Sequence, residues 1–158
     1  MKVKNATHIF IVDSNKLFVS LMGYIFTKND QFEFTEFQSG EECLDNLHRK
    51  PSVIILDFDL PGMNGYDTLL EIKEQFPAAH VIALLSTSAK RTPSEMFSAG
   101  VDDILMREES NFVSKLTEKT ESVLVKKHKP PKKLMRGKKL YYYILIIVLI
   151  TAGIYYYQ

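Results

Sequence analysis

The sequence predicts an α/β fold, in which a doubly wound parallel sheet carries helices on both faces, followed by a C-terminal transmembrane helix. Three observations support this prediction. Five strand-like runs alternate with five segments of helical character within about the first 125 of the 158 residues. All acidic residues precede residue 122, whereas eight basic residues lie between 126 and 139. Residues 140–158 carry no charge.

The predicted strands are short runs of apolar or alternating residues. Residues 8–12 and 104–106 are short apolar runs, and residues 32–37 alternate between apolar and polar side chains. Residues 53–56 and 81–85 are apolar throughout. Alternation is typical of a half-buried strand, and an unbroken apolar run is typical of a strand buried on both faces.

A predicted helix follows each of these strands. Ser39 with Glu42 three residues later forms a capping box at the start of the second helix, and Gly100 is a suitable C-cap for the fourth. Strands that are joined through helices pair in parallel, because each crossover returns the chain to the same edge of the sheet. The predicted helices span residues 17–29, 39–49, 66–75, a short segment ending near 100, and 112–125.

Charge divides the chain into three parts. Residues 1–125 contain 12 basic and 19 acidic residues, a net charge of −7, and suffice for one domain. Residues 126–139 form a basic linker with a charge of +8, and residues 140–157 form the predicted anchor. The single cysteine, Cys43, excludes an internal disulfide and any metal site built from several cysteines.

The predicted anchor is an uncharged stretch of 18 residues, 140–157, with tyrosines at both ends. As a helix it is about 27 Å long, close to the thickness of the hydrocarbon layer, and tyrosine is typical of the membrane interface. A buried strand is the alternative, but it would be about three times the usual length. Because positive charge stays cytoplasmic, we expect a single-pass protein of the cell membrane whose first domain faces the cytoplasm.

The basic linker has a second interpretation. A run of lysines is also typical of nucleic-acid binding. The adjoining apolar span accounts for the run better, because basic residues beside a span contact anionic lipid headgroups. We therefore expect residues 126–157 to contact membrane lipids, and we expect no nucleic-acid partner.

Polar side chains stand at the ends of four of the predicted strands. Asp13 follows the first strand, Asp57 the third, Ser86 the fourth and Arg107 the fifth. The carboxyl ends of parallel strands meet at one edge, where open α/β sheets bind their ligands. The presence of any one of these polar residues is explained by an ordinary turn at the end of a strand. Polar residues at the ends of four strands together indicate a binding site.

Four segments extend this pattern into a family resemblance. IFIVDSN, VIILDFDLPGMNG, VIALLSTSA and AGVDDILMR resemble, in that order, the motif blocks of the response-regulator receiver domain over residues 7–125. The resemblance implies a flavodoxin-like sheet with strand order 2-1-3-4-5. It also implies that Asp57 accepts a phosphoryl group from a histidine kinase or a phosphotransfer protein.

The resemblance also assigns the other site residues. It implies Mg²⁺ held by Asp13, Asp57 and the backbone carbonyl of Asp59, and carboxylate and carbonyl oxygens are the ligands that this ion prefers. It implies that a hydroxyl after the fourth strand and a cation, Arg107, contact the phosphoryl oxygens. A carboxylate such as Asp57 is a suitable nucleophile for forming an acyl phosphate.

Four positions depart from the family pattern. Ser14 stands where receivers carry a second acid, so we expect weaker Mg²⁺ binding. Arg107 replaces a lysine, which keeps the charge but changes its reach and hydrogen-bond geometry. Glu108 replaces a proline, and Ile104 replaces the aromatic residue that acts as a switch in the family.

The segment between the fourth and fifth strands is one residue shorter than in the family. Leu85, Ser86 or Thr87 could therefore take the position of the hydroxyl. We expect a trimmed loop, with Ser86 in that role and Thr87 as its substitute.

Three functions are compatible with these observations. The first is a membrane-tethered phosphorelay receiver that signals to an unidentified output protein through protein–protein contacts. The second is a degenerate receiver that docks proteins without being phosphorylated. The third is a small phosphatase, because Asp57-Phe58-Asp59 also fits the D-x-D motif of haloacid-dehalogenase-type enzymes. These phosphatases place that strand first and need more chain after it, so we expect a receiver and not an enzyme.

Overall fold

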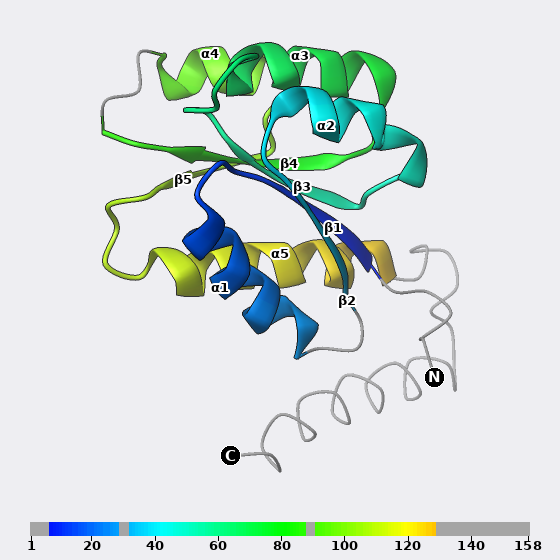
Figure 1. Ribbon diagram of the computed structural model, residues 1–158, viewed down its shortest axis with the longest axis vertical. Coiled ribbons are helices and arrows are strands. Elements are labelled where there is room, and N and C mark those ends of the chain that lie inside the picture. Colours follow the sequence, from blue (N-terminus) through cyan, green and yellow to red (C-terminus); the bar gives the residue numbers. More distant parts are fainter. Residues whose placement is uncertain (1–6, 29–31, 88–90, 129–158) are drawn as a thin grey trace, which may run out of the picture. The chain divides into compact units, whose positions relative to one another are not determined.

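A computed structural model describes residues 7–28, 32–87 and 91–128 of the chain. Within them lies a five-stranded parallel sheet with the order β2-β1-β3-β4-β5, which confirms the strand order implied by the receiver resemblance (Figure 1). The strands are β1 (Thr7–Val12), β2 (Phe32–Phe37), β3 (Val53–Asp57), β4 (His80–Leu85) and β5 (Asp103–Met106). The helices are α1 (Lys16–Thr27), α2 (Gly40–Asp45), α3 (Gly65–Gln75), α4 (Pro93–Ser98) and α5 (Phe112–His128), with a 3-10 turn, η1, at Leu47–Arg49.

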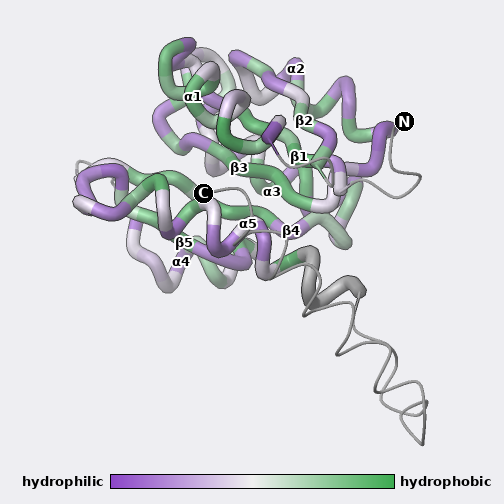
Figure 2. The backbone as a smooth tube through the Cα atoms, turned by 90° about the horizontal axis from the view of Figure 1, so that it is seen from below, coloured by the Kyte–Doolittle hydropathy of each residue, from purple (hydrophilic) through white to green (hydrophobic). Residues whose placement is uncertain are grey.

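The helices form two layers around the sheet. Figure 1 shows α1 and α5 on one face of the sheet and α2, α3 and α4 on the other. Successive strand residues point to opposite faces, so each strand contributes to two separate cores, and Figure 2 shows green, hydrophobic segments at β1 and β3. The face under α2–α4 buries Phe10, Val12, Ile54, Leu56, Val81 and Ala83, and the face under α1 and α5 buries Ile9, Ile11, Val53, Ile55, Ile82 and Leu84.

Polar side chains cap the starts of several helices. The Asn15 side chain accepts hydrogen bonds from the backbone N–H groups of Leu17 and Phe18, which begins α1 directly after the end of β1. Ser39 accepts from the N–H of Glu42, as the capping-box prediction requires. The Glu42 carboxylate accepts instead from the N–H of Gln38, one residue before the cap. These caps fix where α1 and α2 begin, next to the carboxyl ends of the strands that precede them, and the candidate site lies at this edge of the sheet.

The second helix is shorter than the sequence predicts. It ends at Asp45 rather than near Arg49, and a 3-10 turn follows it. The Asn46 side-chain amide donates to the carbonyl of Glu42 at 2.9 Å, a contact that competes with regular helix geometry. Lys50 then takes a left-handed conformation (φ 53°), and its successor Pro51 disfavours further helix.

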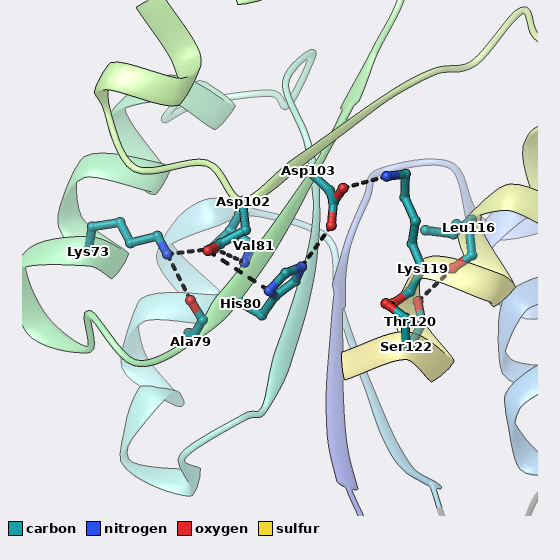
Figure 3. Close-up of polar contacts among 10 residues, drawn as sticks. All are labelled: Lys73, Ala79, His80, Val81, Asp102, Asp103, Leu116, Lys119, Thr120 and Ser122. Atoms are coloured by element: carbon teal, nitrogen blue, oxygen red, sulfur yellow. Dashed lines mark hydrogen bonds and ion pairs between the residues drawn. The ribbon is translucent and has the colours of Figure 1, made fainter. Parts of the chain in front are cut away.

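A polar network holds the edge strand β5 at the end opposite the strand-end residues singled out above. Lys73 of α3 donates to Asp102 Oδ2 at 2.8 Å, and His80 Nε2 lies 2.9 Å from Asp103 Oδ2 (Figure 3). Lys119 of α5 also donates to Asp103. Helices from both layers are therefore bonded to the residues at which β5 begins, α3 to Asp102 and α5 to Asp103.

The chain divides into two units, Met1–Val125 and Lys126–Gln158. Helix α5 extends to His128, three residues beyond its predicted end. The remainder of the predicted linker and the whole predicted anchor, 140–157, lie outside the described residues. Within 7–28, 32–87 and 91–128, no helix is long and apolar enough to cross a bilayer.

Candidate functional site

Asp13 and Asp57 lie side by side at the carboxyl edge of the sheet. Strands β1 and β3 are neighbours, and Val12 pairs with Leu56, so the next residue of each strand reaches the same place. Asp13 is 1 % exposed and Asp57 is 6 % exposed. Two carboxylates in so buried a position need compensating partners.

Arg107 supplies the charge that compensates this pair. Its backbone N–H donates to the carbonyl of Leu85 at 2.8 Å, which continues the pairing of β5 with β4. Its guanidinium Nη2 donates to Asp13 Oδ2 and lies 3.1 Å from Asp57 Oδ2. One cation from β5 thus bridges two anions from β1 and β3.

Backbone N–H groups occupy the other two carboxylate oxygens. The N–H of Asn15 donates to Asp13 Oδ1 at 2.7 Å, and the N–H of Asp59 donates to Asp57 Oδ1 at 3.2 Å. Every carboxylate oxygen of the pair therefore has a partner within the protein.

The hydroxyl groups after β4 separate in space. Ser86 Oγ donates to Asp59 Oδ2 at 2.8 Å, so it contacts the turn that follows Asp57. Thr87 bonds to Glu108, with its N–H 2.9 Å from Oε1. Leu85 is 2 % exposed and packs in the core under α2–α4. Of these three residues, Ser86 is the one that bonds to the turn after Asp57. Ile104 packs partly buried against the same core as Leu85.

The loop after Asp57 is held by close contacts. The N–H of Gly65 donates to the carbonyl of Phe58 at 3.3 Å, and a Cβ at position 65 would lie 2.3 Å from the carbonyl oxygen of Asp57. Only glycine fits there. Glu41 of α2 accepts from the N–H of Met63 at 3.0 Å, beside Gly62, which has a φ of 77°. The glycines of the LPGMNG segment thus let the chain turn tightly around Asp57.

Burial and charge shift the proton affinities at the site. Burial raises the pKa of Asp57, and the neighbouring Asp13 adds to this, against the opposing effect of Arg107. Burial acts to lower the pKa of Arg107, but its contacts with Asp13 and Asp57 outweigh burial and raise it. Negative charge in the pocket is therefore only partly compensated by the guanidinium.

The predicted metal ligands meet only in part. Asp13 and Asp57 adjoin, and the carboxylate of Asp59, which is not the predicted ligand atom of that residue, accepts from Ser86. Among the described residues, no group of three or more His, Cys, Asp or Glu side chains is arranged to hold a metal ion. The two buried carboxylates carry one more negative charge than the single guanidinium compensates. Their oxygen atoms are ligands that Mg²⁺ prefers, so the residues present fit this ion.

Two residues of the site were not singled out from the sequence. The Phe18 ring of α1 lies 5.0 Å from the Arg107 guanidinium and restricts its position. Asn15 both caps α1 and donates to Asp13. The helix-capping role of Asn15 is readable from its position before an apolar helical pattern, whereas the contact of Phe18 depends on how α1 packs.

Comparison with known proteins identifies the class to which this fold and site belong. Residues 9–120 match the response regulator receiver domain, and the chain belongs to that family. The chain is 26 % identical over 100 residues to the response regulator protein VraR of Staphylococcus aureus (strain NCTC 8325 / PS 47). This match covers 63 % of this chain and 48 % of VraR. It spans about half the length of the curated relatives it matches.

Solved receiver structures share the same fold. The Francisella response regulator 1452 receiver domain has a TM-score of 0.66 at 21 % identity, covering 77 % of this chain and 98 % of that one. The signal receiver domain of the putative LuxO repressor protein from Vibrio parahaemolyticus has a TM-score of 0.65 at 20 % identity, with 77 % and 92 % covered. The BeF3-activated DrrB receiver domain has a TM-score of 0.65 at 25 % identity, with 75 % and 97 % covered.

Proposed function

We propose that this chain is a phosphorelay receiver that accepts a phosphoryl group on Asp57 and passes the signal on through protein–protein contacts. The observation that carries the proposal is the buried pair Asp13 and Asp57 with Arg107 between them, at the edge where parallel α/β sheets bind ligands. The donor is a histidine kinase or a phosphotransfer protein, and the signal passes to an output protein.

The residues of the site divide the transfer between them. A carboxylate oxygen of Asp57 attacks phosphorus and forms the new P–O bond, while the P–N bond to the donor histidine breaks and its electron pair stays on the imidazole. Arg107, whose guanidinium lies 3.1 Å from Asp57 Oδ2 in the resting structure, supplies the cation that neutralises the phosphoryl oxygens. Ser86, held beside the site by Asp59, supplies a hydroxyl to one of these oxygens.

Mg²⁺ is the cofactor that this donor set fits. Asp13, Asp57 and the carbonyl of Asp59 would hold it, and it would neutralise charge on the transferred group. We propose no enzymatic turnover: the full chain should not hydrolyse a generic phosphate monoester, and steady release of product would favour the phosphatase alternative.

The proposal is tested by chemical phosphorylation of the full-length chain. Acetyl phosphate with Mg²⁺ should add one phosphoryl group, about 80 Da, and hydroxylamine should remove it because acyl phosphates are labile. Asp57→Asn should abolish labelling, and Asp45→Asn, which changes an exposed carboxylate at the end of α2, should leave it intact. Labelling that survives in Asp57→Asn would place the acceptor elsewhere.

A protein-docking module that is never phosphorylated is the second candidate. It is favoured by the saturation of all four carboxylate oxygens of Asp13 and Asp57 by groups of the protein itself. Failure of the wild type to label, together with labelling of the double variant Ser14→Asp, Arg107→Lys, would identify the module as this degenerate form.

We propose that the phosphodonor docks along α1. Leu17, Leu21 and Tyr24 lie on one side of this helix at spacings of four and three residues, and they are 85 %, 46 % and 63 % exposed. The helix begins three residues after Asp13, and Phe18 in its first turn contacts the Arg107 guanidinium, so this end of α1 borders the site. Exposed apolar side chains at this rim suit a protein partner.

We propose further that residues 140–157 anchor the protein in the cell membrane with the receiver domain facing the cytoplasm. The support is the sequence alone: 18 uncharged residues follow eight basic ones. Tethering confines the domain to the membrane surface, where membrane-bound kinases and output proteins would meet it.

A further inference from the structure

We infer that Arg107 is the resident cation of the acidic pocket and competes directly with Mg²⁺, so that a divalent ion binds the carboxylate pair only when the guanidinium is displaced. This inference concerns the resting state of the site, and its meaning for signalling rests on the proposed function. Its consequence is a receiver whose pocket is closed by its own side chain before any ion or phosphoryl group arrives.

The first support is the identity of the atoms involved. Arg107 Nη2 contacts Oδ2 of both Asp13 and Asp57. The two Oδ1 atoms accept backbone N–H groups from Asn15 and Asp59, which come from the turns that fix each aspartate. An ion that bridged the two carboxylates through their Oδ2 atoms would therefore share both of these oxygens with the guanidinium.

The second support is the way in which Arg107 is fixed. Its backbone is bonded to Leu85 at the end of the β4–β5 pairing, and its side chain is 23 % exposed. The Phe18 ring flanks the guanidinium, with 5.0 Å between the guanidinium carbon and the ring centre, and Phe18 in turn packs on Phe112. A planar guanidinium can bridge two carboxylates and pack on a ring at the same time, which a compact ammonium group does less well.

The third support is charge at short range. An ion bound to both Oδ2 atoms would stand beside the guanidinium that contacts those same atoms, and like charges in a buried pocket repel strongly. Residue 14 does not favour binding of the ion over the guanidinium contact, because Ser14 is exposed and offers a hydroxyl instead of a carboxylate. A third carboxylate there would strengthen divalent binding at the expense of the guanidinium contact.

The test measures Mg²⁺ binding through thermal unfolding of the full-length chain in detergent, at constant ionic strength. An ion that binds the folded state raises Tm with concentration, so the response gives an apparent affinity. Wild type should respond little to millimolar Mg²⁺. Arg107→Gln and Arg107→Ala should melt lower in chelator and regain Tm with Mg²⁺, with an apparent affinity at least about tenfold tighter than that of wild type.

The matched control is Arg91→Ala. Arg91 is an exposed arginine whose guanidinium lies 3.6 Å from the centre of the Tyr66 ring. Its removal changes net charge by the same amount as removal of Arg107 and should leave the Mg²⁺ response as in wild type. A response equal to that of Arg107→Ala would mean that net charge, and not competition in the pocket, governs binding, and it would overturn the inference.

Two further outcomes are decisive. If wild type is stabilised by Mg²⁺ as strongly as Arg107→Gln, Arg107 does not compete, and the inference fails whether or not Asp57 labels with acetyl phosphate. If both neutral variants fail to fold, Arg107→Lys decides, since it keeps the charge but changes the reach and the hydrogen-bond geometry of the side chain: a stronger Mg²⁺ response than wild type supports competition, and an equal one rejects it. If Asp57 is not labelled by acetyl phosphate but the Arg107 variants bind Mg²⁺ more tightly than wild type, the proposed function is contradicted and the inference of competition stands.

Discussion

Asp57 is a carboxylate whose burial opposes its own ionisation. The fold places it 6 % exposed next to Asp13, and one guanidinium serves both anions. Burial is the main cause of its raised pKa. An acid whose pKa is raised on folding is protonated more readily in the folded state, so it contributes less stability as the pH rises above the ordinary carboxyl range, near 4. Ionised Asp57 thus costs the fold stability at neutral pH.

Asp57→Asn should therefore raise the stability of the fold. With chelator at pH 7 we expect a higher Tm, where each 1 kcal/mol corresponds to roughly 3–5 °C for a domain of this size. The gap between variant and wild type should narrow as the pH falls into the acid range, because folded Asp57 takes up its proton at a higher pH than an ordinary carboxyl group. Thermal unfolding monitored by circular dichroism measures both effects. A lower Tm for Asp57→Asn at pH 7 would contradict the conclusion that the ionised Asp57 carboxylate destabilises the fold.

At the scale of elements, β5 is an edge strand that depends on side chains at its start. Asp103 accepts from Lys119 of α5 and contacts His80 of β4, and Asp102 accepts from Lys73 of α3 (Figure 3). Burial opposes ionisation of Asp103, but the combined contacts with Lys119 and His80 outweigh it and lower its pKa. This network therefore stabilises the strand that presents Arg107 at its other end.

Asp103→Asn should weaken this end of the sheet in a pH-dependent way. An acid whose pKa is lowered on folding contributes stability above the ordinary carboxyl pKa and loses it as the pH falls through the folded value. The variant should be less stable than wild type at pH 6–7, by less than about 1 kcal/mol because solvent screens this pair. The difference should shrink below about pH 4. Denaturant unfolding across this range measures it, and a difference that grows in acid would exclude the ion pairs as its cause.

At the scale of the whole molecule, the charges are segregated along the chain. The receiver domain is acidic, the linker carries eight basic residues, and the predicted anchor carries none. The exposed apolar residues are also uneven, with three on α1 beside the site, against Leu70 on α3 and Phe97 on α4. Both features fit a domain that meets its partners at a membrane surface through the α1 side of the site.

The full-length protein should resist extraction from membranes by alkaline carbonate. Replacing two residues at the centre of the span, Ile147→Lys with Val148→Lys, should release it, because each lysine at the centre of a membrane helix costs about 2.5–3.5 kcal/mol. The matched variant Ile147→Leu with Val148→Leu should remain membrane-bound. Recovery of wild type in the soluble fraction without detergent would reject the anchor, and the receiver site would be unaffected by that result.

The sequence by itself determined the five strands and four strand-end residues, Asp13, Asp57, Ser86 and Arg107. Hydrophobic periodicity and turn chemistry are local properties, so they can be read without knowing what packs where. The strand order followed from the family resemblance, since neither spacing nor composition distinguishes one order of parallel strands from another.

Only the tertiary structure decided how these residues meet. It placed the Arg107 guanidinium between Asp13 and Asp57, turned Ser86 toward Asp59, and sent Leu85 into the core. It also ended α2 at Asp45. The physical reason is that each of these outcomes depends on competition between partners that are distant in sequence. A carboxylate oxygen takes the donor that the neighbouring strands and helices bring within hydrogen-bonding distance, and that distance is a property of the packed fold.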